Sequence, residues 1–159
     1  MAAGGASVRL PSDTEILITR TIEAPVRRVF GAWTTPALIR AWWGDHSTLT
    51  VCEIDLRPGG AWRYVARGPD GSERGWSGTF LEVSAPRSLV STEIEDGRAD
   101  VETVSSVTFS ADGDTTVVSI HISYPNRDER DARLDAPMEP HMQSALDRLE
   151  AIVRRPADG

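Results

Sequence analysis

Apolar and polar residues alternate with a period of two over most of the chain, which is the pattern of β-strands. Residues 14–24 are rich in β-branched side chains at even spacing, and the alternation returns in six later stretches, at residues 47–56, 60–67, 74–84, 87–95, 100–110 and 115–123. Turn sequences such as "RPGG" and "GPDG" separate these stretches. Because short connections join antiparallel neighbours, the pattern predicts a seven-stranded antiparallel sheet with one apolar face.

Helical periodicity flanks the strand-rich region. Residues 26–33 carry apolar side chains at the spacing of one helical face, and a second short helix follows and is expected to end at Gly44. Residues 141–153 have a strong apolar stripe with the period of an amphipathic helix. The charged segment 127–136, with Asn126 as a candidate cap, is interpreted as a solvated turn or short helix.

A sheet with one apolar face needs a cover, and the terminal helix is the only predicted element long enough to supply it. One helix cannot fill the whole concave side of a twisted sheet that curls around it. We therefore expect an α+β fold in which a gap remains between the sheet, the terminal helix and the two short helices. Concave, mostly apolar gaps of this kind are where small molecules bind.

Composition and charge narrow the functional classes. The 159 residues suit one domain, expected at residues 14–154, with flexible tails at 1–13 and 155–159. A net charge of −7 argues against a nucleic-acid partner. No apolar stretch is long enough for a membrane span, and the N-terminal segment has no secretory pattern. The lone Cys52 excludes an internal disulfide, so we expect a cytoplasmic protein.

Four stretches of the sequence, in order, carry a family resemblance: "APVRRVFGAWTTPALIRAWWG", "CEIDLRPGGAWRYVARGPDG", "SGTFLEVSAPRSLV" and "SALDRLEAIV". They resemble a bacterial member of the START-like (SRPBCC) superfamily, in the branch similar to the C-terminal domain of the activator of the ninety-kilodalton heat-shock protein's ATPase. The resemblance implies the helix-grip fold. It also implies a shared cavity rather than a shared reaction, since the superfamily includes lipid carriers, polyketide cyclases and co-chaperone domains.

We expect the cavity to be lined from both sides. The terminal helix supplies one side, with Met138, His141, Met142 and Leu146. The other side consists of Trp42 and strand residues, namely Trp62, Tyr64, Trp76, Phe80, Ile94, Val107 and Ile120. Core packing is the alternative for each of these large rings, and for Trp33 we favour the core.

Three functional hypotheses follow. The first is a binding protein for a small hydrophobic or aromatic molecule, with no cofactor, no metal and no catalytic residue. The second is a cyclase or dehydratase acting on an aromatic or polyketide-like substrate, which needs a polar group such as Tyr64, Glu82, Glu93 or His141 in the cavity. The third is an interaction module with a chaperone or a homodimer partner, which a filled interior and an exposed apolar patch favour.

Overall fold

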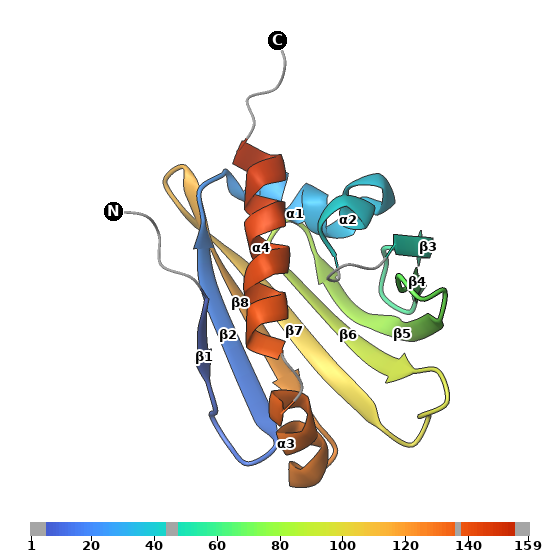
Figure 1. Cartoon of the computed structure of the whole chain (residues 1–159). Helices are drawn as coiled ribbons and strands as arrows, with labels where there is room; N and C mark the ends of the chain where they lie inside the picture. Colours follow the sequence, from blue (N-terminus) through green and yellow to red (C-terminus); the bar gives the residue numbers. More distant parts are fainter. Residues whose placement is uncertain (1–5, 44–47, 136–137, 155–159) are drawn as a thin grey trace.

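The computed structural model describes residues 6–43, 48–135 and 138–154, with the backbone alone for residues 138–141 (Figure 1). In this part of the chain the elements are β1 (Ser7–Arg9), β2 (Glu15–Ile22), α1 (Val26–Thr34), α2 (Pro36–Trp42), β3 (Thr48–Ile54), β4 (Ala61–Arg67), β5 (Glu73–Ser84), β6 (Ser88–Glu95), β7 (Glu102–Asp112), β8 (Thr115–Ser123), α3 (Arg127–Asp135) and α4 (Met138–Arg154). Two predictions lie outside the described residues: the end of the second short helix at Gly44, and the C-terminal tail at residues 155–159.

The strands form one antiparallel sheet in the order β1-β2-β8-β7-β6-β5-β4-β3. Figure 1 shows α4 lying along one face of this curved sheet, with α1 and α2 near one end of the helix and α3 near the other. We call the face toward α4 the inner face. The predicted α+β architecture, with two short helices after the first long strand and a C-terminal helix against the sheet, is confirmed.

The sheet has eight strands rather than the predicted seven, because residues 7–9 form β1 along the edge of β2. The sequence pattern predicts a flexible tail at residues 1–13, which include this strand. A strand of three residues is too short to show an alternating pattern. The neighbouring Ala6 is also held in place, since its backbone N–H and C=O each form a 2.9 Å hydrogen bond with the side-chain amide of Gln143 on α4.

Gly78 of β5 lies tightly against β6. A Cβ at this position would lie 1.8 Å from the backbone oxygen of Thr92 on β6, so no larger residue fits without a shift of the backbone. The close approach brings the Trp62 indole across β5, where its Nε1–H donates to the same Thr92 oxygen over 3.1 Å. Trp62 is thereby fixed on the inner face.

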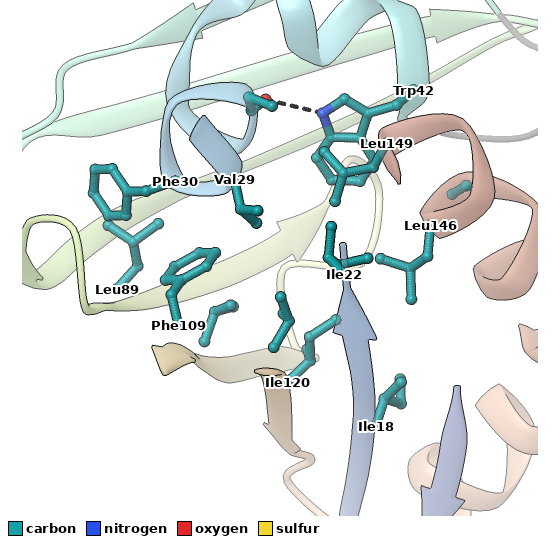
Figure 2. Packing of buried hydrophobic residues seen from close by; sticks show 14 of the residues in the cluster. Ile18, Ile22, Val29, Phe30, Trp42, Leu89, Phe109, Ile120, Leu146 and Leu149 are labelled. Carbon is teal, nitrogen blue, oxygen red and sulfur yellow. Dashed lines mark hydrogen bonds between the residues drawn. The ribbon is translucent and has the colours of Figure 1, made fainter. Parts of the chain in front are cut away.

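The hydrophobic core lies between β2, β7, β8, α1 and α4. Ile18 and Ile22 of β2 point toward Leu146 and Leu149 of α4 in Figure 2, and all four side chains are fully buried. Phe30 of α1 packs edge-on against Phe109, with ring centroids 5.3 Å apart. Trp42 of α2 closes this region by donating from Nε1 to the backbone oxygen of Ala32 (Figure 2).

Candidate ligand cavity

A cavity of about 600 Å³ lies beside this core, between the inner face of the sheet and helices α3 and α4. Strands β4 to β8 supply most of its wall, α4 contributes Met142 and Ala145, and α3 contributes Glu129, Ala132 and Arg133. The exposed side chains of Arg98 and Arg133 line it as well, so the cavity opens to solvent beside α3. This volume is in the range of sites for drug-sized molecules.

Aromatic side chains form one wall of the cavity. Trp43 contacts Tyr64 and Trp76 edge-on, with centroid separations of 5.3 and 5.0 Å, and Tyr64 lies 4.9 Å from Trp62. Each ring is held by its neighbours. The wall is therefore formed by side chains that already pack against one another, with their remaining faces and edges toward the cavity.

Most of the predicted site residues line this cavity: Trp42, Trp62, Tyr64, Trp76, Phe80, Val107, Ile120 and Met142. The side chains of Met138 and His141 lie outside the described residues. The sequence pattern left core packing and cavity lining as alternatives for each large ring, but one side chain can do both. Trp42 and Trp62 are only 5% and 7% exposed, yet both border the cavity, as does Trp33.

Ile94 and Leu146 do not line the cavity. On β6 the cavity-lining residues are Leu89, Ser91, Glu93 and Glu95, so the alternation of the strand turns Ile94 to the outer face of the sheet. Leu146 is fully buried in the core. The α4 stripe meets the core at Leu146 and Leu149 and borders the cavity only at Met142 and Ala145.

The cavity has a polar end around Glu93. Burial raises the pKa of the Glu93 carboxyl, and the nearby charge of Glu95 raises it further, while Arg133 acts in the opposite direction. The Glu93 side chain is nevertheless exposed to water, which reaches it through the cavity. Burial also raises the pKa of Tyr64, and it raises that of Tyr124 to about 12, so both phenols keep their protons at neutral pH.

Glu82, the other acid that the sequence left undecided, is exposed and lies outside the cavity lining. The register of β5 against β6 shifts between Phe80 and Glu82. This irregularity reverses the side-chain parity after Phe80, so that Phe80 faces the cavity and Glu82 does not.

Charged residues at the opening are paired. Arg74 of β5 lies 2.9 Å from Glu95, and Arg98 of the β6–β7 connection lies 2.8 Å from Glu129 of α3. The second pair joins the sheet to the charged segment that the sequence analysis interpreted as a solvated helix or turn. The segment is helical and Asn126 caps it by accepting from the Glu129 N–H over 2.9 Å, but its inner side lines the cavity.

We expect Glu93→Gln to stabilise the protein at pH 8 and to leave it unchanged at pH 4. The folded-state pKa of Glu93 lies above its ordinary value of 4.5, so below pH 4.5 both the folded and the unfolded chain hold the proton. As the pH rises, the unfolded chain releases the proton first, and the charged carboxylate then costs stability in the folded state.

Thermal unfolding followed by circular dichroism measures this effect. Because water in the cavity screens the charge, we expect a gain of only about 2 °C in Tm at pH 8. Glu82→Gln, at an exposed acid outside the cavity, is the control and should change Tm by about 1 °C or less at both pH values. An equal gain for Glu93→Gln at pH 4 and pH 8 would contradict the assignment.

The remaining candidate groups lie outside the cavity. The Cys52 thiol is buried against Ile39, Leu49 and Ala66, and burial raises its pKa. His121 contacts Glu15 through a 2.6 Å Nε2–Oε2 pair between β8 and β2. In the described ranges no three His, Cys, Asp or Glu side chains gather as a metal site requires. None of the helices described here has the length and apolar character needed to cross a membrane.

A curved antiparallel sheet holding a C-terminal helix, with a cavity between them, is the architecture of the START-like helix-grip proteins. Residues 23–154 match the model of the family described as "Activator of Hsp90 ATPase homolog 1-like protein". The chain belongs to this family, as the four sequence stretches indicated. No curated protein matches the chain.

Solved structures share the fold over nearly the whole chain. A protein from Rhodobacter sphaeroides is 26% identical with a TM-score of 0.85, over 92% of this chain and 96% of that one. Protein Ms6760 from Mycobacterium smegmatis is 23% identical with a TM-score of 0.84, over 97% and 99% of the two chains. CalU16 from Micromonospora echinospora is also 23% identical, with a TM-score of 0.64 over 99% and 88%. The likeness to the last two establishes the fold alone.

Proposed function

We propose that this protein binds a small hydrophobic or aromatic molecule in the cavity between the sheet, α3 and α4. The observation that carries the proposal is a cavity of about 600 Å³ with an aromatic wall and an opening to solvent. Apolar surface that water reaches is costly, and a ligand that covers the indole and phenol rings removes it from water. Membership in the family is consistent with this function and does not identify the ligand.

A matched pair of variants on β7 tests the proposal. Ser105 of β7 lines the cavity. Ser106 is the next residue of the same strand, so its side chain faces the outer side of the sheet. Ser105→Phe should fill part of the cavity and weaken binding of 2-methoxynaphthalene, an apolar bicyclic probe, by about tenfold or more, whereas Ser106→Phe should leave the affinity within about twofold. Isothermal titration calorimetry measures the affinities.

The same probe should raise the melting temperature of the wild-type protein. At ten times its dissociation constant it stabilises by about 1.4 kcal/mol, which corresponds to roughly 3–5 °C for a domain of this size. A wild-type protein that shows neither heat of binding nor a change in Tm with this probe, with 2-naphthol or with a charged naphthalene would contradict the proposal.

An enzyme is the second candidate, and one observation favours it. Glu93 places a carboxyl with a raised pKa inside the cavity, near the hydroxyls of Tyr64 and Tyr124. A carboxyl in such a place can act as a general acid or base. A cyclase or dehydratase acting on an aromatic or polyketide-like substrate would use it, and turnover that is lost in Glu93→Gln while binding persists would favour this candidate.

The interaction module receives less support. Its expected signs were a filled interior and an exposed apolar patch. The cavity does not fit the first sign, and the exposed large apolar side chains among the described residues, Leu10, Leu38 and Leu81, come from three separate segments. Single exposed leucines are ordinary on protein surfaces.

A further inference from the structure

We infer that the ligand is an aromatic molecule with a neutral hydroxyl group, and that Glu93 accepts the hydrogen bond that this hydroxyl donates. The inference rests on the proposed function and specifies the chemistry of the ligand. It follows from which charged groups of the cavity already have protein partners and which carboxyl has none.

Six charged side chains line the cavity: Arg74, Arg98, Arg133, Glu93, Glu95 and Glu129. Two ion pairs at the opening engage four of these side chains, with N–O distances of 2.9 and 2.8 Å. Arg133 lies close to Tyr124, where it acts to lower the pKa of the phenol against the larger effect of burial. Within the part of the chain that the structure describes, the Glu93 carboxyl makes no hydrogen bond or ion pair, and its side chain is exposed where it lines the cavity.

A ligand that fills the cavity covers the exposed Glu93 carboxyl, and a carboxyl that is covered without a hydrogen-bond donor costs free energy. Glu93 lies within the electrostatic range of Tyr64, Tyr124, Glu95 and Arg133, on four different parts of the fold. These surroundings place an acceptor in a cavity that also has an aromatic wall. A ligand that reaches both must be an aromatic ring system with a hydrogen-bond donor at one end.

The charges around Glu93 select a neutral donor. A ligand cation would be attracted by Glu93 and Glu95 but repelled by Arg133, and it would lose much more hydration free energy on entering the cavity than a neutral hydroxyl does. A ligand carboxylate would in turn be repelled by Glu93 and Glu95. A phenolic hydroxyl avoids both penalties, and it donates to a carboxylate through a charge-assisted hydrogen bond.

Four naphthalene probes of similar size test the inference: 2-naphthol, 2-methoxynaphthalene, 2-naphthoate and 2-naphthylmethylammonium. Calorimetric titration of the wild-type protein should show 2-naphthol binding about tenfold or more tighter than 2-methoxynaphthalene, which cannot donate. Both charged probes should bind more weakly than 2-naphthol.

Glu93→Leu should remove the preference. Its affinities for 2-naphthol and 2-methoxynaphthalene should agree within about twofold, because 2-methoxynaphthalene no longer covers an unpaired carboxyl and therefore binds this variant more tightly than it binds the wild type. Glu82→Leu, on the exposed acid outside the cavity, is the matched control and should keep the full preference. Circular dichroism melts establish that each variant is folded.

The outcomes separate the two proposals. Equal affinity of the wild type for 2-naphthol and 2-methoxynaphthalene, or a preference that survives in Glu93→Leu, would overturn the role of Glu93 and leave cavity binding standing. Tightest binding of a charged probe would overturn the neutral-hydroxyl class. Absence of binding by all four probes would contradict the proposed function itself.

Discussion

Leu146→Ala should lower the free energy of unfolding by about 3–5 kcal/mol, which corresponds to a fall in Tm of roughly 10 °C for a domain of this size. Leu146 is fully buried, and Figure 2 shows its side chain among the isoleucines of β2. Removal of three methyl and methylene carbons there leaves a void that a sheet and a helix on opposite sides cannot close. The cost therefore includes both the lost burial and the new cavity.

Met142→Ala is the matched control for this prediction, because Met142 lies one helical turn earlier on the same stripe of α4. Met142 is only partly buried and borders the ligand cavity, so its truncation enlarges an existing space. We expect a cost of about 1 kcal/mol. Urea unfolding followed by circular dichroism measures both variants, and a Leu146→Ala cost equal to that of Met142→Ala would contradict the division of α4 into a core part and a cavity part.

This division could not be read from the sequence. Period and apolar character identified the α4 stripe, and every residue on it is compatible with either a core or a cavity. Whether a residue of α4 packs against other side chains or borders the cavity depends on the distance between the helix and the curved sheet at that point along the helix. That distance is set by long-range pairing of strands, so Met142 was placed correctly at the cavity and Leu146 was not.

Most of the sheet side of the cavity could be predicted, because strand alternation places side chains directly. Residues at alternate positions share one face of a strand, as do Trp62 with Tyr64 on β4 and Trp76 with Phe80 on β5. The large apolar side chains at these positions, and at Val107 on β7, identify that face as the inner one. The prediction fails on β6, where Ile94 was chosen because it is apolar. There the inner positions after Leu89 are Ser91, Glu93 and Glu95.

The failure on β6 is itself informative. Beyond Leu89 the binary pattern is inverted, with Val90, Thr92 and Ile94 on the outer face and polar residues on the inner face. Selection for stability alone would place apolar residues on the inner face of a strand. On β6, polar residues occupy the inner face opposite the aromatic wall. Such departures are expected at functional sites, and this inversion was the signal in the sequence that could have identified Glu93 as a site residue.

Other parts of the site depend on contacts between distant segments. The Arg98–Glu129 pair joins residues 31 positions apart, and neither the turn before β7 nor the charged α3 sequence shows that they meet at a cavity opening. The highly charged composition of α3 supports a solvated face, which it has, but gives no sign of its lining role.

Arg20→Ala should lower the free energy of unfolding by about 3 kcal/mol, because it breaks a buried ion pair between the sheet and α4. Arg20 occupies an inner-face position of β2 and is 6% exposed. Its guanidinium lies 2.7 Å from Asp147 and 3.0 Å from Glu150 on α4. Glu150 also accepts the backbone N–H of Glu23 over 2.8 Å, so one carboxylate links α4 to β2 and to the segment that follows it.

The expected cost lies at the low end of the range for buried ion pairs, because only one of the two carboxylates stays buried. The side chain of Asp147 is 67% exposed and can be hydrated after Arg20 is removed, whereas that of Glu150 is 14% exposed. Arg20→Met should cost less than Arg20→Ala, since methionine keeps much of the packed volume over the core. Arg57→Ala is the control, because its pair with Asp55 is exposed on both sides, and we expect a change of about 0.5 kcal/mol or less.

Urea unfolding at low and high salt distinguishes the buried pair from the exposed one. The difference between the wild type and Arg20→Ala should persist at about 1 M salt, where the Debye length is about 3 Å, because salt does not reach the guanidinium beneath α4. A cost for Arg20→Ala as small as that for Arg57→Ala, or one that disappears in salt, would contradict the role of the Arg20 ion pair in holding α4 on the sheet.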